Sequence, residues 1–174
     1  VRRATVGTVV QLDQAAGEFV LDSPAPAKVL FITAGSGITP VMGMLRSMPA
    51  DTPSDVVVVH SAPTAADVIF GSELRMLAAQ NRIRLVEIHT DTDGMLAVDT
   101  LDHLVGELAE YHSWACGPAP LLDAIENHWA AAGIAHQLHT ERFRSNVSAI
   151  GDGGSVTFSV TGRTVENDGA ESLL

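Results

Sequence analysis

Short apolar runs alternate with amphipathic segments along most of this chain, from about residue 28 to residue 143. The runs are rich in β-branched residues, which favour strands, and the segments between them carry apolar residues at helical spacing. This alternation is typical of an α/β fold, here a five-stranded parallel sheet of order 3-2-1-4-5 with helices on both faces. The strands are predicted at Lys28–Thr33, Asp55–Ser61, Ile83–Thr90, Tyr111–Cys116 and His136–Glu141.

The composition is that of an acidic globular protein. Apolar residues make up 46% of the chain and the formal net charge is −11. Nucleic-acid binding is excluded, because phosphate contacts need clustered Lys and Arg and only ten are spread along the chain. No apolar stretch approaches the roughly 20 residues that span a bilayer, so we expect no membrane span and a cytoplasmic location. One cysteine, Cys116, cannot ligate a cluster alone, and redox chemistry here needs a bound organic cofactor.

The two ends of the chain differ from its centre. Residues 1–27 contain β-like segments, a turn at Ala16-Gly17 and a Pro-rich stretch, which we interpret as the tail of a preceding β domain and a linker. The central α/β domain is expected to span residues 28–145. Residues 146–174 begin with linker composition and continue as a short hairpin turning at Thr161-Gly162. An isolated hairpin is marginally stable, so we expect the start of a third, truncated domain.

The segment TAGSGITP directly follows the first predicted strand and precedes a helix. Its glycines let the backbone approach a pyrophosphate, its hydroxyls are hydrogen-bond donors, and a helix N-terminus attracts anions. The alternative is a plain strand-to-helix turn, because the segment lacks the third glycine of GxGxxG and the lysine of a Walker A loop. The predicted cofactor-binding residues here are Gly35, Ser36, Gly37, Ile38, Thr39 and Pro40.

Two further motifs end the fourth and fifth predicted strands. Cys116-Gly117-Pro118 ends the fourth strand and precedes a helix over about residues 119–132. The fourth strand is expected to lie beside the first, and the crevice above the carboxyl ends of these two strands is the switch point where ligands bind. Cys116 is expected to pack its sulfur against a nicotinamide ring, the alternative being a buried thiol without a role. Glu141 and Phe143 follow in the same crevice, where a carboxylate and an aromatic ring can orient a nicotinamide and cover a flavin. The alternative is a surface Glu and a core Phe.

In this order and on these strand ends, the three motifs resemble the ferredoxin-NADP reductase superfamily, above all the reductases that serve oxygenases and desaturases. The resemblance covers roughly residues 17–145. It implies that the nucleotide pyrophosphate is held by Gly35, Ser36, Gly37 and Thr39, with Thr39 and Pro40 also near the flavin. It implies as well that the nicotinamide pocket is formed by Cys116, Gly117 and Pro118. It further implies that Cys116, Glu141 and Phe143 are the catalytic residues, placed where hydride reaches the flavin.

The resemblance also implies partners beyond this chain. Hydride would pass from NAD(P)H to FAD, and electrons would leave through a 2Fe-2S centre to an oxygenase or membrane desaturase. The flavin motif of the preceding barrel is absent here, although residues 18–21 look like the barrel's last strand. The hairpin and the ending GAESLL look like the opening of a plant-type 2Fe-2S ferredoxin domain, before its cysteines. We therefore expect NAD(P)H binding, with FAD held mostly by the missing barrel, 2Fe-2S only in the parent protein, and little activity from this fragment alone.

The choice between NADH and NADPH is open from the sequence. After the third strand, Thr90 and Asp91 occupy positions that read the ribose in this family, and an Asp there favours NADH because it repels a 2′-phosphate. After the second strand, His60 and Ser61 resemble members that take NADPH, and Arg82 or Arg84 nearby would compensate the Asp.

Two other functions remain as alternatives. The first is a stand-alone flavin reductase or flavohaemoglobin-like module, which the ferredoxin-like tail argues against. The second is a non-catalytic electron-transfer regulatory subunit, which the absence of cysteines after Cys116 argues against.

Overall fold

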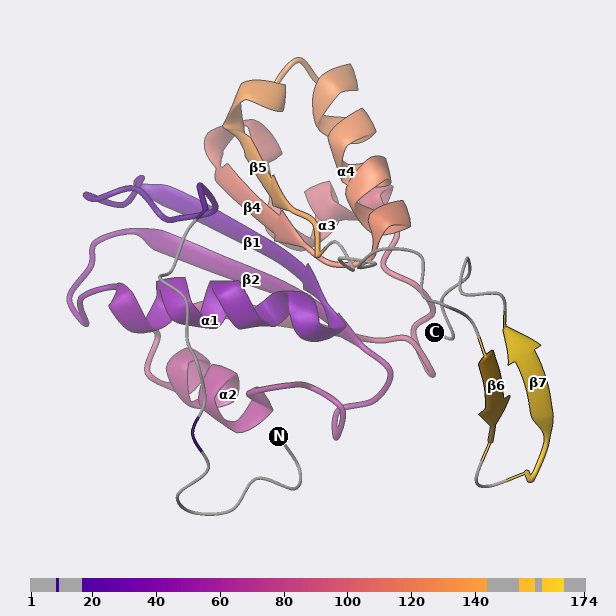
Figure 1. The fold of residues 1–174 in the computed structure, drawn as a ribbon. Coiled ribbons are helices and arrows are strands. Elements are labelled where there is room, and N and C mark those ends of the chain that lie inside the picture. The colour runs from indigo at the N-terminus through magenta and orange to yellow at the C-terminus, as the bar shows by residue number, and fades with distance from the viewer. Residues whose placement is uncertain (1–8, 10–16, 144–153, 159–160, 168–174) are drawn as a thin grey trace. The chain divides into compact units, whose positions relative to one another are not determined.

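The computed structural model describes residues 9, 17–143, 154–158 and 161–167. The chain divides into two compact units, residues 1–142 and 143–174, which we describe separately. In the first unit, parallel strands alternate with helices (Figure 1). The strands are β1 (Lys28–Ala34), β2 (Asp55–Ala62), β3 (Arg84–His89), β4 (His112–Cys116) and β5 (Leu138–Glu141). The helices are α1 (Ile38–Ser47), α2 (Gly71–Ala79), α3 (Leu101–Val105) and α4 (Ala119–Ala131), with 3-10 turns at Gly35–Gly37, Val98–Thr100, Leu108–Glu110 and Ala135–Gln137.

The sheet order is β3-β2-β1-β4-β5 and all four pairings are parallel, which confirms the predicted topology. Crossover connections between parallel strands are right-handed. Because the chain steps outward from β1 to β3 and then returns to β4 and β5, the two sets of helices cover opposite faces. Helices α1 and α2 pack on one face, and α3 and α4 pack on the other.

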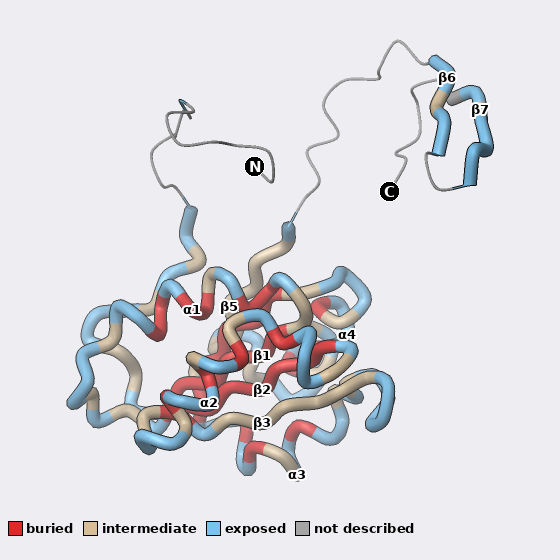
Figure 2. The backbone as a smooth tube through the Cα atoms, turned by 90° about the horizontal axis from the view of Figure 1, so that it is seen from below, coloured by how far each residue is buried: buried red, intermediate tan, exposed pale blue. Residues whose placement is uncertain are grey.

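The core consists of two apolar layers separated by the sheet. The central strands β1 and β2 are buried over most of their length (Figure 2). Phe31 and Val58 point toward α1 and α2, whereas their neighbours Ile32 and Val57 point toward α3 and α4. The central strands are therefore buried on both faces, which explains their unbroken apolar runs. The apolar stripes of α1 and α4 lie in these layers, as expected for ordinary core.

Each predicted strand differs from the observed one by one or two residues at one end or both. The fifth strand begins at Leu138 rather than His136, because residues 135–137 form a 3-10 turn. The third strand is shorter than predicted at both ends. Helix α1 begins at Ile38, so Pro40 lies two residues inside its first turn, where its missing N–H costs no helical hydrogen bond.

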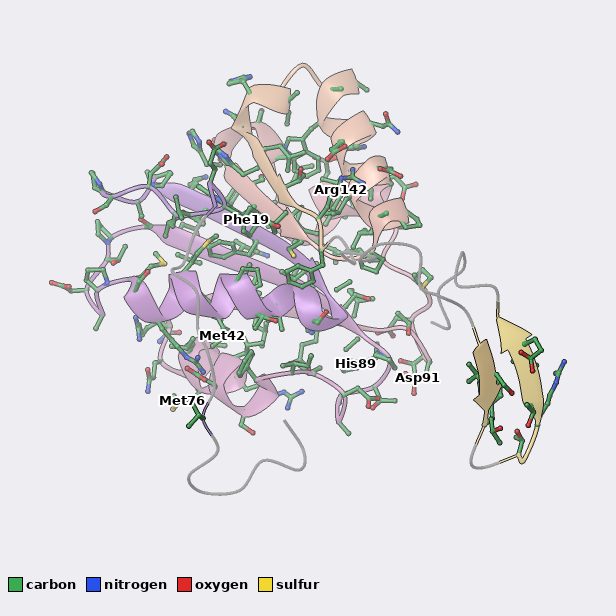
Figure 3. All side chains as sticks on the ribbon, viewed as in Figure 1. Phe19, Met42, Met76, His89, Asp91 and Arg142 are labelled. Atoms are coloured by element: carbon green, nitrogen blue, oxygen red, sulfur yellow. The ribbon has the colours of Figure 1, made fainter. Side chains whose placement is uncertain are left out.

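Residues 17–27 contain no helix or strand, so the β strand expected at residues 18–21 is not formed in this chain. Phe19 and Leu21 pack instead against the layer beneath α1 and α2 (Figure 3). The indole Nε1 of Trp114 donates a hydrogen bond to the carbonyl oxygen of Val20 at 3.0 Å. The β-like segment expected before Ala16 lies outside the described residues, except for Val9.

The second unit contains the predicted hairpin. Strands β6 (Gly154–Thr157) and β7 (Thr164–Asn167) pair antiparallel. The turn between them includes Gly162, which has a φ of 67° and donates its N–H to the carbonyl of Phe158. Residues 144–153, 159–160 and 168–174 lie outside the described residues, and with them the predicted linker and the ending GAESLL. In the described part of the chain, no helix is long and apolar enough to cross a membrane.

Candidate functional site

Five polar residues stand in one row across the carboxyl edge of the sheet. Residues paired in register on neighbouring parallel strands share a face, and this row lies on the face that carries α1 and α2. The pairings run from β3 through β2, β1 and β4 to β5, and join Glu87, His60, Thr33, Cys116 and Glu141. The sequence singled out His60, Cys116 and Glu141, but did not identify Thr33 and Glu87 as members of a site.

The turn after β1 and the turn after β4 face each other, as the predicted strand order requires. A Cβ atom on Gly37 would lie 2.0 Å from the carbonyl oxygen of Cys116 and 2.9 Å from the N atom of Gly117. A Cβ on Gly117 would lie 3.3 Å from the N atom of Ala34. Only glycine at position 37 permits this approach of two backbones at the middle of the sheet edge.

The turn after β1 has the geometry of a phosphate cradle. Gly35 has a φ of 53°, in the left-handed region that favours glycine. The 3-10 turn Gly35–Gly37 runs directly into α1, and the Ile38 N–H already bonds to the carbonyl oxygens of Gly35 and Ser36. No side chain caps the start of the 3-10 turn, so the N–H groups there are the ones that remain for a ligand. Ser36 and Thr39 are exposed, and the Thr39 hydroxyl donates to the Ser36 carbonyl. Ile38 is fully buried and can offer a ligand only its backbone.

Cys116 is a neutral thiol in this site. It is fully buried, and burial together with the nearby Glu141 carboxylate raises its pKa from 9.0 to about 11. Because the thiolate is the nucleophilic form of cysteine, this residue is a polarizable packing group rather than a nucleophile at neutral pH. Gly117 and Pro118 follow directly, and α4 begins after Pro118 as predicted.

His60 and Ser61 lie in β2, as the predicted strand Asp55–Ser61 already implies, and the loop that was compared with NADPH-binding members begins only after Ala62. Both are buried, since β2 continues to Ala62. The Nδ1 atom of His60 is 2.8 Å from the Thr33 hydroxyl, and its Nε2 atom has no partner among the described residues. Burial lowers the pKa of His60 while the Glu87 carboxylate opposes this shift, so the ring is neutral at pH 7.

The ends of β2 and β3 are joined beyond the sheet. Thr90 donates its N–H to the carbonyl of Ala62, and Asp91 donates its N–H to that of Pro63. Asp91 is exposed beside His89 at the end of β3 (Figure 3). Thr90 and Asp91 thus lie at the carboxyl edge, where the sequence placed them.

Arg82 and Arg84 lie at the opposite edge of the sheet, which corrects the suggestion that they would compensate Asp91. Arg84 begins β3, about 16 Å from the end of that strand at roughly 3.3 Å per residue. Its guanidinium donates to the carbonyls of Leu104 and Val105 at the end of α3, and that of Arg82 donates to Met48. The carboxyl ends of β2 and β3, with the loops that follow them, are called the β2–β3 corner below. The guanidinium at this corner belongs to Arg75 of α2, which the sequence interpretation did not identify.

The end of β5 is fastened to α4. The Nη2 atom of Arg142 lies 2.8 Å from carboxylate oxygens of both Asp123 and Glu126. The Thr140 hydroxyl also donates to Glu126. These contacts fix the backbone on both sides of Glu141, which is partly buried. Phe143 is 55% exposed and is the first residue of the second unit, so its place beside a flavin stays a prediction.

Known proteins are similar to this chain in sequence and in fold. The chain is 46% identical over 171 residues to an NADPH oxidoreductase of Mycobacterium tuberculosis, covering 97% of this chain and 45% of that protein. It is 33% identical over 145 residues to the ferredoxin reductase component of a 3-ketosteroid-9-alpha-monooxygenase from the same species, covering 82% of this chain and 40% of that protein. The chain thus spans less than half the length of either relative.

A solved structure of phthalate dioxygenase reductase has the same fold. It superposes with a TM-score of 0.60 at 20% identity, covering 91% of this chain and 49% of that one. The model of the oxidoreductase NAD-binding domain matches residues 31–127, more than half of this chain. This match spans both the cradle after β1 and the turn after β4. The chain therefore belongs to the oxidoreductase NAD-binding domain family, within the ferredoxin-NADP reductase superfamily.

Proposed function

We propose that the carboxyl edge between β1 and β4 binds NAD(P)H and presents its nicotinamide for hydride transfer to a flavin. The observation that carries this proposal is the contact of Gly37 with the backbone of Cys116, which leaves two glycine turns facing each other at the switch point of the sheet. Ligands of open α/β sheets bind at this point. Membership of the family supports the nucleotide as the ligand.

In this proposal, residues 35–39 hold the pyrophosphate. The left-handed Gly35 exposes backbone N–H groups, the Ser36 side chain is free in the described structure, and the uncapped start of α1 carries partial positive charge. Pro40 removes one N–H from the first turn and fixes its direction. Ile38 anchors the turn in the core, so the cradle keeps its shape with or without a ligand.

The nicotinamide end lies on Cys116 and Gly117. The Glu141 carboxylate, on the strand next to Cys116, orients the amide of the ring. Contact between the ring and the Cys116 thiol stays a prediction, because that side chain is fully buried. A flavin bound beside this edge would supply the hydride acceptor, and NAD(P)H would be the two-electron donor. The chain's own residues position the ring and exclude water from one side of it.

In the whole protein we propose that electrons pass from NAD(P)H to FAD, then to a 2Fe-2S centre and finally to an oxygenase. Residues 1–27 would be the end of a flavin-binding barrel, and residues 146–174 the beginning of a ferredoxin domain. The similarity to the reductase component of a monooxygenase supports an oxygenase as acceptor. Phthalate dioxygenase reductase, which shares this fold, has a modular structure for electron transfer from pyridine nucleotides to a 2Fe-2S centre. A membrane desaturase as acceptor, and a cytoplasmic location, stay predictions.

Calorimetric titration of the chain with NADPH and NADH, with an absorbance scan for copurified flavin, tests this function. We expect binding of at least one nucleotide and no turnover by the flavin-free chain. Absence of binding by both nucleotides would refute the nucleotide site. NADPH-dependent dye reduction by the purified, flavin-free chain would refute the claim that hydride transfer requires a separate flavin domain.

A further inference from the structure

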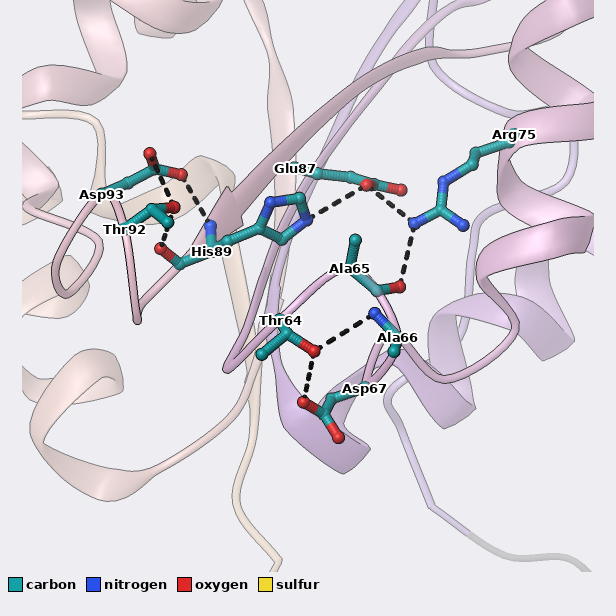
Figure 4. Close-up of polar contacts among 9 residues, drawn as sticks. All are labelled: Thr64, Ala65, Ala66, Asp67, Arg75, Glu87, His89, Thr92 and Asp93. Atoms are coloured by element: carbon teal, nitrogen blue, oxygen red, sulfur yellow. Dashed lines mark hydrogen bonds and ion pairs between the residues drawn. The ribbon is translucent and has the colours of Figure 1, made fainter.

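Arg75 reaches the carboxyl edge of the sheet from the second turn of α2. Its Nη2 atom lies 2.9 Å from the Oε2 atom of Glu87 and 3.2 Å from the carbonyl oxygen of Ala65 (Figure 4). The same Glu87 oxygen is 3.3 Å from the Nε2 atom of His89. The loop after β2, through Ala65, and strand β3, through Glu87, thus hold this guanidinium in place.

Most of the hydrogen-bonding capacity of Arg75 is unused. A guanidinium carries five N–H donors in a fork that fits phosphate. Both hydrogen bonds of Arg75 come from Nη2, and Nε and Nη1 make none within the described part of the chain. The side chain is 46% exposed, so these donors are accessible.

The guanidinium borders an open groove of about 530 Å³. The groove lies between the loop after β2 and the first turn of α2, and Nη1 of Arg75 is so close to Gly71 that a Cβ there would stand 3.1 Å from it. No side chain caps the nine-residue α2, whose start adds partial positive charge. The lining residues are Ala65, Ala66, Val68, Phe70, Gly71, Ser72, Glu73 and Arg75.

Two of the nearby carboxylates are already engaged in hydrogen bonds. The Thr64 hydroxyl donates to Asp67 at 2.6 Å (Figure 4). Asp93 accepts the N–H of His89 at 2.8 Å and the Thr92 hydroxyl. Glu87 is 16% exposed and offsets part of the Arg75 charge. Glu73, which lines the groove, is paired with Arg46 at 2.6 Å. Asp67, Asp91 and Asp93 are exposed and keep their negative charge, so all three oppose an anion at this corner.

We propose that Arg75 and this groove bind the 2′-phosphate of NADPH, so that the chain takes NADPH in preference to NADH. This inference rests on the proposed function, which places the pyrophosphate after β1 and therefore directs the adenosine toward β2 and β3. A phosphate carries about two negative charges and can accept hydrogen bonds from the open Nε and Nη1 donors while Glu87 keeps Nη2. Glu87 holds the fork ready, which lowers the entropy lost on binding.

The test is calorimetric titration of the whole chain with four probes, NADPH, NADH, 2′-AMP and 5′-AMP. For the wild type we expect NADPH to bind about tenfold or more tightly than NADH, and 2′-AMP more tightly than 5′-AMP, as for a charge-assisted contact. Arg75→Ala should remove this preference and leave the affinity for NADH within about twofold of the wild-type value. Arg75→Lys keeps the charge without the fork and should retain only part of the preference.

Arg82→Ala is the matched control, because it removes the same charge at the opposite edge of the sheet. We expect it to leave all four affinities unchanged, and circular dichroism checks that each variant is folded. If the wild type binds NADH as well as NADPH, or Arg75→Ala weakens both nucleotides equally, the 2′-phosphate site is refuted while the nucleotide domain stands. If the wild type binds neither nucleotide, both proposals fail.

Discussion

Gly37 and Cys116 meet backbone to backbone, at a distance that leaves no space for even a methyl group on residue 37. A Cβ atom would stand 2.0 Å from the Cys116 carbonyl oxygen, an atom that the parallel ladder between β1 and β4 holds in place. The start of α1 and the end of β4 are therefore coupled. Any side chain at position 37 separates the two turns that we assign to the nucleotide.

Gly37→Ala should destabilise the protein by about 1–3 kcal/mol, since overpacking against fixed backbone cannot relax cheaply. Gly43→Ala is the matched control in the helix that follows. It has no atom within 4 Å of the added Cβ, and an exposed helical Gly→Ala change should stabilise by about 0.5–1 kcal/mol. Urea unfolding of both variants measures the difference. Equal effects of the same sign would show that the close approach is wrong.

His60 makes stability depend on pH. Burial lowers its folded pKa below the ordinary 6.5, so below that pH the unfolded chain binds a proton that the folded chain does not. The free energy of unfolding should therefore fall as pH drops below about 6.5, by up to about 1.4 kcal/mol per pH unit. His60→Gln should flatten this slope below about pH 6.5, and His136→Gln, at an exposed position, is the matched histidine substitution. If the slope is unchanged in His60→Gln, titratable groups other than His60 cause the pH dependence.

Cys116 should resist alkylation in the folded protein. With its pKa raised from 9.0 to about 11, the thiolate fraction at pH 8 is about 100-fold lower than for an ordinary thiol, and the sulfur is buried as well. Iodoacetamide labelling followed by mass spectrometry should be slow in buffer and fast in urea, and the native rate should rise toward pH 11. Rapid native labelling at pH 7–8 would mean that the thiol is exposed and reactive.

Phe19 should contribute to stability although it precedes the sheet. Its ring packs against the layer under α1 and α2, and truncating a partly buried aromatic side chain costs about 1–2 kcal/mol, less than a fully buried one. Val20→Ala is the neighbouring control, because the Val20 side chain is 60% exposed and only its carbonyl contacts Trp114. Thermal unfolding of Phe19→Ala and Val20→Ala compares them. Identical melting temperatures would argue against the packing of this segment.

The elements that sequence predicts well are those set by local patterns. The apolar runs of β1 and β2 and the glycine turn at residues 35–37 follow from composition within a few residues. The sheet order is taken from a known doubly wound topology rather than from the local pattern, and the meeting of the two turns follows from that order. Residues 28–143 are therefore largely predictable as a fold.

The parts of the site that were missed depend on contacts across strands and helices. Thr33 and Glu87 join the polar row through strand register, which no local pattern encodes. Arg75 reaches Glu87 because of the rotation of α2 about its axis. Arg82 and Arg84 looked close to Asp91 in the sequence, but they lie at the other end of β3, since each residue of a strand adds about 3.3 Å.

Amide chemical-shift mapping during titration with NADPH tests the central claim most directly, because it reports where on the chain the nucleotide binds. We predict the largest shifts at residues 35–39 and around Gly117, with further shifts at the β2–β3 corner near Arg75. Residues 48–54 at the opposite edge of the sheet should not move. Shifts confined to that opposite edge, or no shift at residues 35–39, would contradict a nucleotide site at the carboxyl edge between β1 and β4.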